Sequence, residues 1–318
     1  MRLLSLIAAL CCLAGSALAD QYPSRSVRVV VAAPPGGLTD IVARTVSQFL
    51  HEKLGQPFVV ENIAGASSTI GAVQVARAAP DGYTLLVNPS LFVITPMLMN
   101  VQYDVMKDFT PISNFGTVPV SIGINPEIPA KNIQEFIALA KANPDKFTWG
   151  AEGVGAVGHL TMERLMREGG FKFLVVHYKG TSPALIDLMA GRVSALVTPV
   201  PNLIEQFRGG KVRPIAVTTK QRLNTLPDVP TLEESGFPNF EIGSWYGLWG
   251  PAGMPADVVA TLNKGIAEAV NAPGVMDKVA QQGLIPVGSS SADFAKFQAA
   301  EMAKYQKIIN DSNIKIGN

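Results

Sequence analysis

Short runs rich in valine and isoleucine alternate along this chain with longer segments in which apolar residues recur every three or four positions. The first run covers residues 27–33, and a helical pattern follows it from residue 38 to about residue 54. Parallel sheets covered by helices on both faces produce this alternation. The pattern therefore predicts an α/β fold.

The same alternation continues toward the C-terminus. Further strands are expected at residues 57–61, 83–87, 147–151, 173–178, 193–198, 212–218 and 240–250. Helices are expected from the turn at 65–68 as far as residue 78, and at 133–142, 159–167, 255–270 and 291–310. Asn132 and Glu135 have the spacing of a capping box, which favours a helix start at residue 133.

The length of the chain suggests two lobes rather than one core, because about 300 residues exceed what a single simple core usually holds. Hydrophobic residues make up 47% and charged residues 16%, which fits large buried sheets. Chain crossings are expected near residues 119–125 and 240–245. We assign residues 20–121 and 244–318 to lobe 1, and residues 122–243 to lobe 2.

The first nineteen residues have the pattern of a secretory signal peptide. Met1 and Arg2 give a basic start, residues 3–13 are mostly apolar, and Ala17-Leu18-Ala19 is a small-residue cleavage pattern. Cys11 and Cys12 both lie inside this segment, so the mature chain has no disulfide, thiol nucleophile or cysteine metal site. The sequence predicts export to the periplasm.

The charge of the mature chain argues against two classes of partner. Once Arg2 is removed with the signal peptide, 25 basic residues stand against 25 acidic ones. Nucleic acids and anionic membranes select for basic surfaces. We therefore expect neither of these partners.

Two glycine turns at predicted helix starts are the main candidates for a binding site. Pro35-Gly36-Gly37 joins the first strand to the helix that carries Thr39 and Asp40, and 153–158 joins a later strand to the helix that begins near His159. A helix start has unpaired backbone N–H groups and the positive end of the helix dipole, so it favours a phosphate or a carboxylate. An ordinary strand-to-helix turn is the simpler interpretation of each.

Residues 153–158 also match the G-x-G-x-x-G pattern of dinucleotide-binding proteins. The motif lies deep in the second lobe, although it should open the first strand–helix–strand unit. The position about twenty residues later, where an acid should hold the ribose, falls among Val176, His177, Tyr178 and Lys179. The pattern is therefore better interpreted as a second N–H-rich turn, and no cofactor is expected.

Residues suited to catalysis show no recognised arrangement. His51, His159 and His177 are scattered and lack metal-ligand spacing, and the usual nucleophile motifs are missing. Asp40 and Glu152 could form an acid pair, but capping and turn roles are commoner for such residues. We therefore expect neither an enzyme nor a metal site. Trp245 and Trp249 are expected to pack in the core or at the hinge.

Nine short motifs in a fixed order then give a resemblance that covers essentially the whole mature chain. They are Pro35–Asp40, Glu61-Asn62 with Gly65, 79–84, Tyr103-Asp104 with Lys107–Phe109, Gly158–Leu160, 178–180, 210–213, 226–231 and Ser244–Leu248. Together they resemble the solute-binding receptors of tripartite tricarboxylate transporters, the Bug-type periplasmic proteins.

This resemblance implies a two-lobed periplasmic-binding-protein (Venus-flytrap) fold, with each lobe a mostly parallel sheet flanked by helices. It also implies a monomer that captures a small carboxylate in the interlobe cleft and presents it to integral membrane permease subunits. Family members hold the carboxylate mainly through backbone N–H groups and waters. By position, the ligand-binding residues would be Ala33, Pro35, Gly36, Gly37, Thr39, Asp40, Ala66, Ser67, Asn88, Ser90, Glu152, Val154, Gly155, Val157, Gly158, His159, Tyr178, Lys179, Thr198 and Pro199.

Two questions stay open at this stage. The same fold and pocket would serve a co-receptor for a membrane sensor, and an exported enzyme could use the same scaffold. Ala33 stands where family members often have an aromatic residue, which leaves space on the lobe 1 wall. We expect this space to favour a carboxylate on a bulkier apolar body over a compact acid such as malate.

Overall fold

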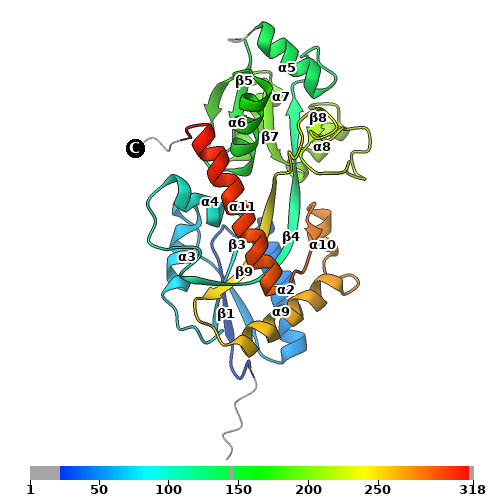
Figure 1. The fold of residues 1–318 in the computed structure, drawn as a ribbon. Helices are drawn as coiled ribbons and strands as arrows, with labels where there is room; N and C mark the ends of the chain where they lie inside the picture. The colour runs from blue at the N-terminus through cyan, green and yellow to red at the C-terminus, as the bar shows by residue number, and fades with distance from the viewer. Residues whose placement is uncertain (1–21, 144–145, 179, 315–318) are drawn as a thin grey trace, which may run out of the picture.

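The computed structural model describes residues 22–143, 146–178 and 180–314 (Figure 1). It has two lobes built on one mixed sheet with the strand order β2-β1-β3-β9-β4-β7-β5-β6, and β8 and β10 pair with β4 beside this path. The predicted signal peptide, residues 1–19, lies outside the described residues. Within the described ranges, no helix is both long and apolar enough to cross a membrane.

The first lobe has three parallel strands at its centre. β1 (Val27–Val31) lies between β2 (Phe58–Asn62) and β3 (Thr84–Pro89). Val29 and Val30 of β1 point to opposite faces and are both buried, which explains why this strand is an unbroken apolar run. The helices of this lobe are α2 (Leu38–Leu54), η1 (Ala66–Ser68), α3 (Thr69–Ala76), α4 (Leu91–Leu98), α9 (Ala256–Asn271) and α10 (Asp277–Gln281).

The second lobe repeats this plan with shorter strands. β5 (Thr148–Ala151) lies between the parallel strands β6 (Leu174–His177) and β7 (Ala195–Pro199), and β8 (Arg213–Val217) runs antiparallel to β4. Its helices are α5 (Ile133–Ala142), α6 (Val157–Gly169), α7 (Thr181–Met189), η2 (Val200–Asn202) and α8 (Ile204–Arg208).

Two long antiparallel strands connect the lobes. β4 (Phe109–Ile124) pairs with β9 (Gly243–Pro251) and with the short β10 (Ile285–Pro286) along its first part, and with β7 and β8 at its end. α11 (Ser291–Asp311) extends along both lobes in Figure 1, and its Asp311 accepts a 2.7 Å hydrogen bond from Arg167 of α6. The lobes are therefore joined by strands at the hinge and by a helix across their side.

The two tryptophans of β9 pack in the core beneath α11, as expected. Trp245 donates its indole N–H to the Tyr305 hydroxyl at 3.1 Å, and Trp249 donates to Gln298 Oε1 at 2.7 Å. Both indole rings are almost fully buried. Because each buried N–H has a partner on α11, these bonds fix the helix against the crossing strand.

The main difference from the sequence prediction is the length of β4. The sequence predicted only a crossing near residues 119–125, but the strand begins at Phe109 and has 16 residues. Pro111 and Pro119 concealed it, because proline cannot donate to a sheet and argues against a central strand. The register with β9 shifts between Pro111 and Ser113, and this irregularity accommodates the first proline.

Candidate functional site

The predicted site residues gather where strands end. β1, β2 and β3 of the first lobe, and β5, β6 and β7 of the second, each lead from their carboxyl ends into a turn or helix start. In open α/β sheets this edge is the usual position of a ligand. Nineteen of the twenty predicted residues are described there, and Lys179 lies outside the described residues.

Asp40 organises the turn of the first lobe. Its carboxylate accepts hydrogen bonds from the Gly36 N–H at 2.9 Å, from Arg44 Nε at 3.0 Å and from Asn62 Nδ2 at 2.9 Å. Burial opposes ionisation of Asp40, but the bonds from Arg44, Gly36 and Asn62 together lower its pKa. Asp40 is therefore an anion that holds the turn, and its oxygens are already engaged.

His159 has the equivalent role in the second lobe. Its Nδ1 accepts a 3.1 Å hydrogen bond from the Gly155 N–H, and its ring stacks on Trp149 with centroids 5.6 Å apart. Burial, together with the nearby His177, lowers the pKa of His159 to about 4, so the ring is neutral at pH 7. His159 therefore holds the Gly155 turn through its Nδ1.

The two turns thus have the same construction. In each, a glycine with φ near +80° donates its N–H to a side chain four residues later, and a helix starts in between. The first helical bonds run from Ile41 to Gly37 and from Leu160 to Ala156. Within the described ranges, the N–H groups of the residues between, 37–39 and 157–159, donate to no protein group. These are the donors that could meet a carboxylate.

A third turn of the first lobe has an unusual backbone. Ala66, Ser67 and Ser68 have φ values of 44°, 53° and 72°, which residues other than glycine rarely adopt. The sequence predicted a simple helix-opening turn here. Consecutive left-handed residues often mark a ligand-binding or switch segment, because neighbouring structure must hold them. Ser67 is exposed, and its carbonyl accepts a 3.3 Å hydrogen bond from Thr95 of α4.

Glu152 forms a polar cluster at the end of β5. Its Oε2 accepts hydrogen bonds from the Thr181 hydroxyl at 2.7 Å and from the Thr198 hydroxyl at 2.5 Å. Burial raises the pKa of Glu152, although the two threonine hydroxyls act in the opposite direction. Asp40 and Glu152 therefore have different partners, and no bond joins them as an acid pair among the described residues.

Asn88 and Ser90 flank the end of β3. Both are buried, and the amide oxygen and nitrogen of Asn88 have no hydrogen-bond partner among the described residues. Buried polar atoms nearly always find a partner in proteins, in a water or a ligand where not in the chain. The Ser90 N–H is already bonded to the Trp245 carbonyl at 2.8 Å, so Ser90 ties α4 to the crossing strand.

The remaining predicted residues divide between backbone and packing positions. Tyr178 donates its hydroxyl proton to Asp187 of α7 at 2.6 Å, so this proton is already used within the protein. Gly158 packs so closely on β7 that a Cβ there would overlap the Val197 carbonyl. Ala33, Pro35, Val154 and Pro199 are at least partly exposed along the turns, while Thr39 and Val157 are buried.

The turn of the second lobe also touches the first lobe. A Cβ added at Gly155 would overlap the Leu98 side chain of α4 and lie 3.5 Å from Ile94 Cγ2. On the α10 side, a Cβ added at Gly283 would overlap the Pro201 ring of η2. Both contacts join the two lobes.

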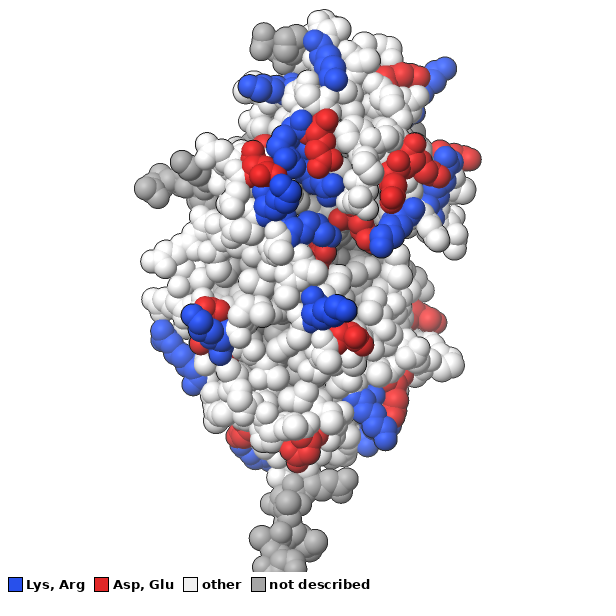
Figure 2. All heavy atoms as spheres, viewed as in Figure 1, with Lys and Arg blue, Asp and Glu red and all other residues white. Residues whose placement is uncertain are grey.

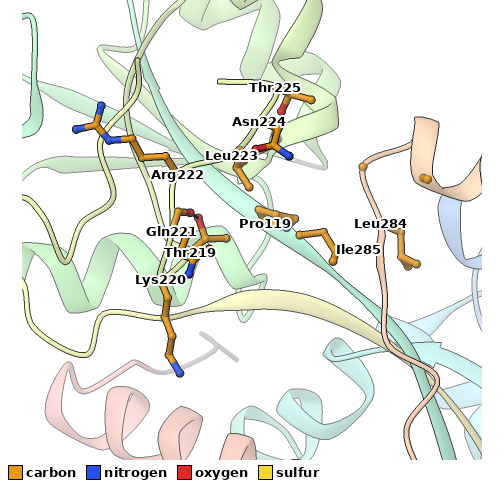
Figure 3. Close-up of a pocket in the computed structure, with 13 residues that line it drawn as sticks. Pro119, Thr219, Lys220, Gln221, Arg222, Leu223, Asn224, Thr225, Leu284 and Ile285 are labelled. Carbon is orange, nitrogen blue, oxygen red and sulfur yellow. Dashed lines mark hydrogen bonds between the residues drawn. The ribbon is translucent and has the colours of Figure 1, made fainter. Parts of the chain in front are cut away.

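A cavity lies away from these turns. It has a volume of about 650 Å³ and is lined by Pro119 of β4, the loop 219–225 and residues near Leu284 (Figure 3). None of the predicted ligand residues lines it. Its two cations already have partners, because Lys220 pairs with Glu241 at 3.2 Å and Arg222 with Glu234 at 2.9 Å. This cavity is therefore a poor place for a carboxylate.

The surface charge is consistent with a small-molecule ligand. On the face drawn in Figure 2, lysine and arginine side chains lie next to aspartate and glutamate instead of forming a separate basic area. The described residues contain no group of three or more potential metal ligands.

Sequence reasoning missed three residues of the site. Thr181 holds Glu152 from the start of α7, and Leu98 meets the second turn. Burial, and to a smaller extent the charge of Glu152, raises the pKa of Tyr246 of β9. Tyr246 belongs to one of the nine motifs, which was its only signal. The other two come together only in the fold.

Comparison with known proteins gives a consistent family. The family model described as the tripartite tricarboxylate transporter family receptor matches residues 42–314. Protein BugT of Bordetella pertussis is 34% identical over 321 residues, which cover 99% of this chain and 98% of that protein.

Two solved structures extend the comparison to three dimensions. The periplasmic binding protein BugD is 36% identical with a TM-score of 0.77, covering 92% of this chain and 99% of that one. An R. palustris protein solved with adipate is 32% identical with a TM-score of 0.81, again covering 92% and 99%.

Proposed function

Because the chain belongs to the tripartite tricarboxylate transporter receptor family, we propose that it is a periplasmic protein that captures a small organic carboxylate between its two lobes. In this proposal residues 20–121 and 244–318 form lobe 1 and residues 122–243 form lobe 2. The chain leaves the cytoplasm by a signal peptide at residues 1–19 and delivers its ligand to the membrane subunits of a tripartite transporter. The relative solved with adipate supports a carboxylate as the ligand class.

One observation carries the proposal: each lobe presents a glycine turn whose shape is fixed from within. Asp40 and His159 hold these turns, and the N–H groups at the starts of α2 and α6 have no protein partner among the described residues. Donors that are already ordered bind an anion without a further loss of conformational entropy. Because the acid and the imidazole are already used to hold backbone, the arrangement supports binding more than catalysis.

The energetic requirement is modest. Micromolar affinity corresponds to about 8 kcal/mol. A hydrogen bond to a charged group contributes about 1.5–3 kcal/mol before ordering costs are subtracted. Several backbone donors from two lobes are therefore sufficient without a buried arginine.

A thermal-shift screen against organic acids tests the proposal first. A ligand that binds only the folded state must raise the melting temperature. Acids that do so are then titrated by calorimetry and recovered afterwards. We expect one-to-one binding and recovery of the unchanged acid. Turnover of the acid, or no stabilisation by any carboxylate, would contradict the proposal.

A further inference from the structure

Helix α11 brings a buried tyrosine to the place where the chain crosses between the lobes. Tyr305 is fully buried, and its hydroxyl donates to the Gly243 carbonyl at 3.3 Å, at the first residue of β9. The same hydroxyl accepts the indole N–H of Trp245 at 3.1 Å. One hydroxyl group of α11 therefore makes two hydrogen bonds to the start of the crossing strand.

The other end of this network lies just after β3, in the predicted ligand rim. The Ser90 N–H donates to the Trp245 carbonyl at 2.8 Å, so Ser90 and the Tyr305 hydroxyl bind the same residue of β9. Burial raises the pKa of Tyr305 well above its usual value, and a hydrogen bond with the Ser90 side chain acts in the opposite direction. Tyr305 thus contacts a predicted ligand residue and the crossing strand at the same time.

Two charged residues extend this network along α11. The Lys304 ammonium group pairs with the buried Glu301 carboxylate and donates to the Glu241 carbonyl at 3.0 Å, two residues before β9 begins. Both side chains line a cavity of about 110 Å³, together with residues 117–119 of β4 and 241–243. The crossing strands and α11 therefore leave space between them, and this space can absorb a change in the angle between the lobes.

The second tryptophan of β9 provides a contrast. Trp249 also donates its indole N–H to α11, at Gln298 Oε1, but it pairs with Leu86 of β3 inside the sheet of the first lobe. Gln298 in turn donates to Met106 Sδ at 3.4 Å, in the same lobe. The Trp249 bond therefore holds α11 within one lobe, whereas the Trp245 bond belongs to a network that joins the ligand rim to the crossing.

We propose that Tyr305 is a positioning residue that couples ligand contact at Ser90 to the position of the crossing strand at Gly243. The inference rests on the proposed carboxylate-binding function. Asn88, whose buried amide has no partner among the described residues, lies two residues before Ser90, so a ligand or a water is expected at this end of β3. A ligand that orders Ser90 favours the strand position in which Tyr305 bonds to β9, and by linkage that position favours the ligand.

Two matched variants test the inference. Tyr305→Phe removes the hydroxyl and Gln298→Met removes the amide, and each leaves one buried indole N–H of β9 without its partner on α11. Both should lower the free energy of unfolding in urea to a similar extent. Affinity is measured by calorimetry with whichever of malate, succinate, glutarate, adipate, hexanoate and benzoate stabilises the wild type most. We expect affinity to fall at least about fivefold in Tyr305→Phe and to stay at the wild-type value in Gln298→Met.

Indole N–H signals in nitrogen-15 NMR spectra give a readout that needs no variant. The chain has three tryptophans and so three such signals. Saturation of the wild type with the same acid should shift the Trp245 signal, whose partner is Tyr305, more than the Trp249 signal, whose partner is Gln298. This comparison decides the question should Tyr305→Phe not fold.

The outcomes separate the two levels of the account. Wild-type affinity in a folded Tyr305→Phe, equal losses of affinity in the two variants, or a Trp245 shift no larger than that of Trp249 would overturn the coupling and leave carboxylate binding intact. Failure of every acid to bind the wild type would overturn the proposed function, and the inference with it.

Discussion

Asp40 and His159 show how single side chains shape this site. Each lies four residues after a glycine with positive φ and accepts that glycine's N–H. The sequence predicted both residues as part of the ligand rim, and their position at a helix start was readable from the glycine turns. Arg44 lies four residues after Asp40 on the same helix, so this partner is local. Asn62 was not predictable, because it reaches Asp40 only once β2 and α2 lie side by side.

Asp40→Asn tests the first turn. The pKa of Asp40 is lowered in the folded state, so the stabilisation by its charge is present above pH 3.8 and is lost as the pH falls through the folded pKa. Because Arg44 is half exposed, we expect a loss of only about 1–2 kcal/mol at pH 7. Urea unfolding at pH 7 and pH 3 measures it, and the loss should shrink at the lower pH.

The exposed Asp228 supplies the control for this experiment. Asp228→Asn should change stability little at either pH. Equal effects of the two substitutions would show that the Asp40 network does not stabilise the turn.

Glu152→Gln should stabilise the ligand-free protein at pH 7, whereas Asp40→Asn should destabilise it. Burial raises the pKa of Glu152, so the folded state loses stability as the pH rises from 4.5 through the raised folded pKa. The neutral variant avoids this cost. Its melting temperature should therefore exceed that of the wild type at pH 7 and approach it below pH 4.5. A lower melting temperature at pH 7 would show that the charge stabilises the empty site.

At the scale of elements, the local sequence pattern predicted the ends of two helices, but it did not predict features that depend on long-range strand pairing. The helices at 38–54 and 133–142 begin and end as predicted, and Asn132 accepts the Glu135 N–H at 2.9 Å as the capping box requires. The length of β4 escaped prediction because its pairing with β9, β7 and β8 compensates for prolines that local propensity penalises. The left-handed run at 66–68 has no sequence signal beyond its small residues.

Gly155→Ala tests the contact between the second turn and α4. The added methyl would overlap Leu98 and also meet a φ of 79° that alanine adopts at a cost. Since this contact joins the lobes, closure should suffer, and we expect at least a tenfold loss of ligand affinity, about 1.4 kcal/mol. Gly274→Ala is the matched control, because Gly274 has a φ of 80° and no atom within 4 Å of its Cβ position. Calorimetry of both variants separates overlap from backbone strain, and equal affinities would contradict the role of the contact.

The whole molecule has contacts between its lobes that opening would break. They include the Gly155 turn on α4, Gly283 beside Pro201, and the bond between Arg167 and Asp311. A ligand that touches both lobes shifts such an equilibrium toward the closed form. Small-angle scattering should therefore show a smaller radius of gyration at saturating ligand. An unchanged radius would indicate a rigid pocket.

The family could be predicted from the order of nine weak motifs, but the ligand could not. The candidate site combines groups from distant parts of the chain, such as Glu152 and Thr181, which only the fold brings together. Ala33 is half-buried beside the first turn. The expectation that it leaves room for a bulky acid stays a prediction.

The most direct test of the account is a calorimetric titration of the wild type and Gly37→Val with the acids that stabilise the wild type. Gly37 has a φ of −79°, which valine adopts readily, and the nearest atom to its Cβ position is the Pro34 carbonyl oxygen at 3.8 Å. The variant should therefore fold with a near-normal melting temperature. Its side chain would block approach to the N–H groups of the turn, so we predict one-to-one binding by the wild type and none measurable by Gly37→Val. Equal affinity of a folded variant would place the carboxylate elsewhere and contradict the account.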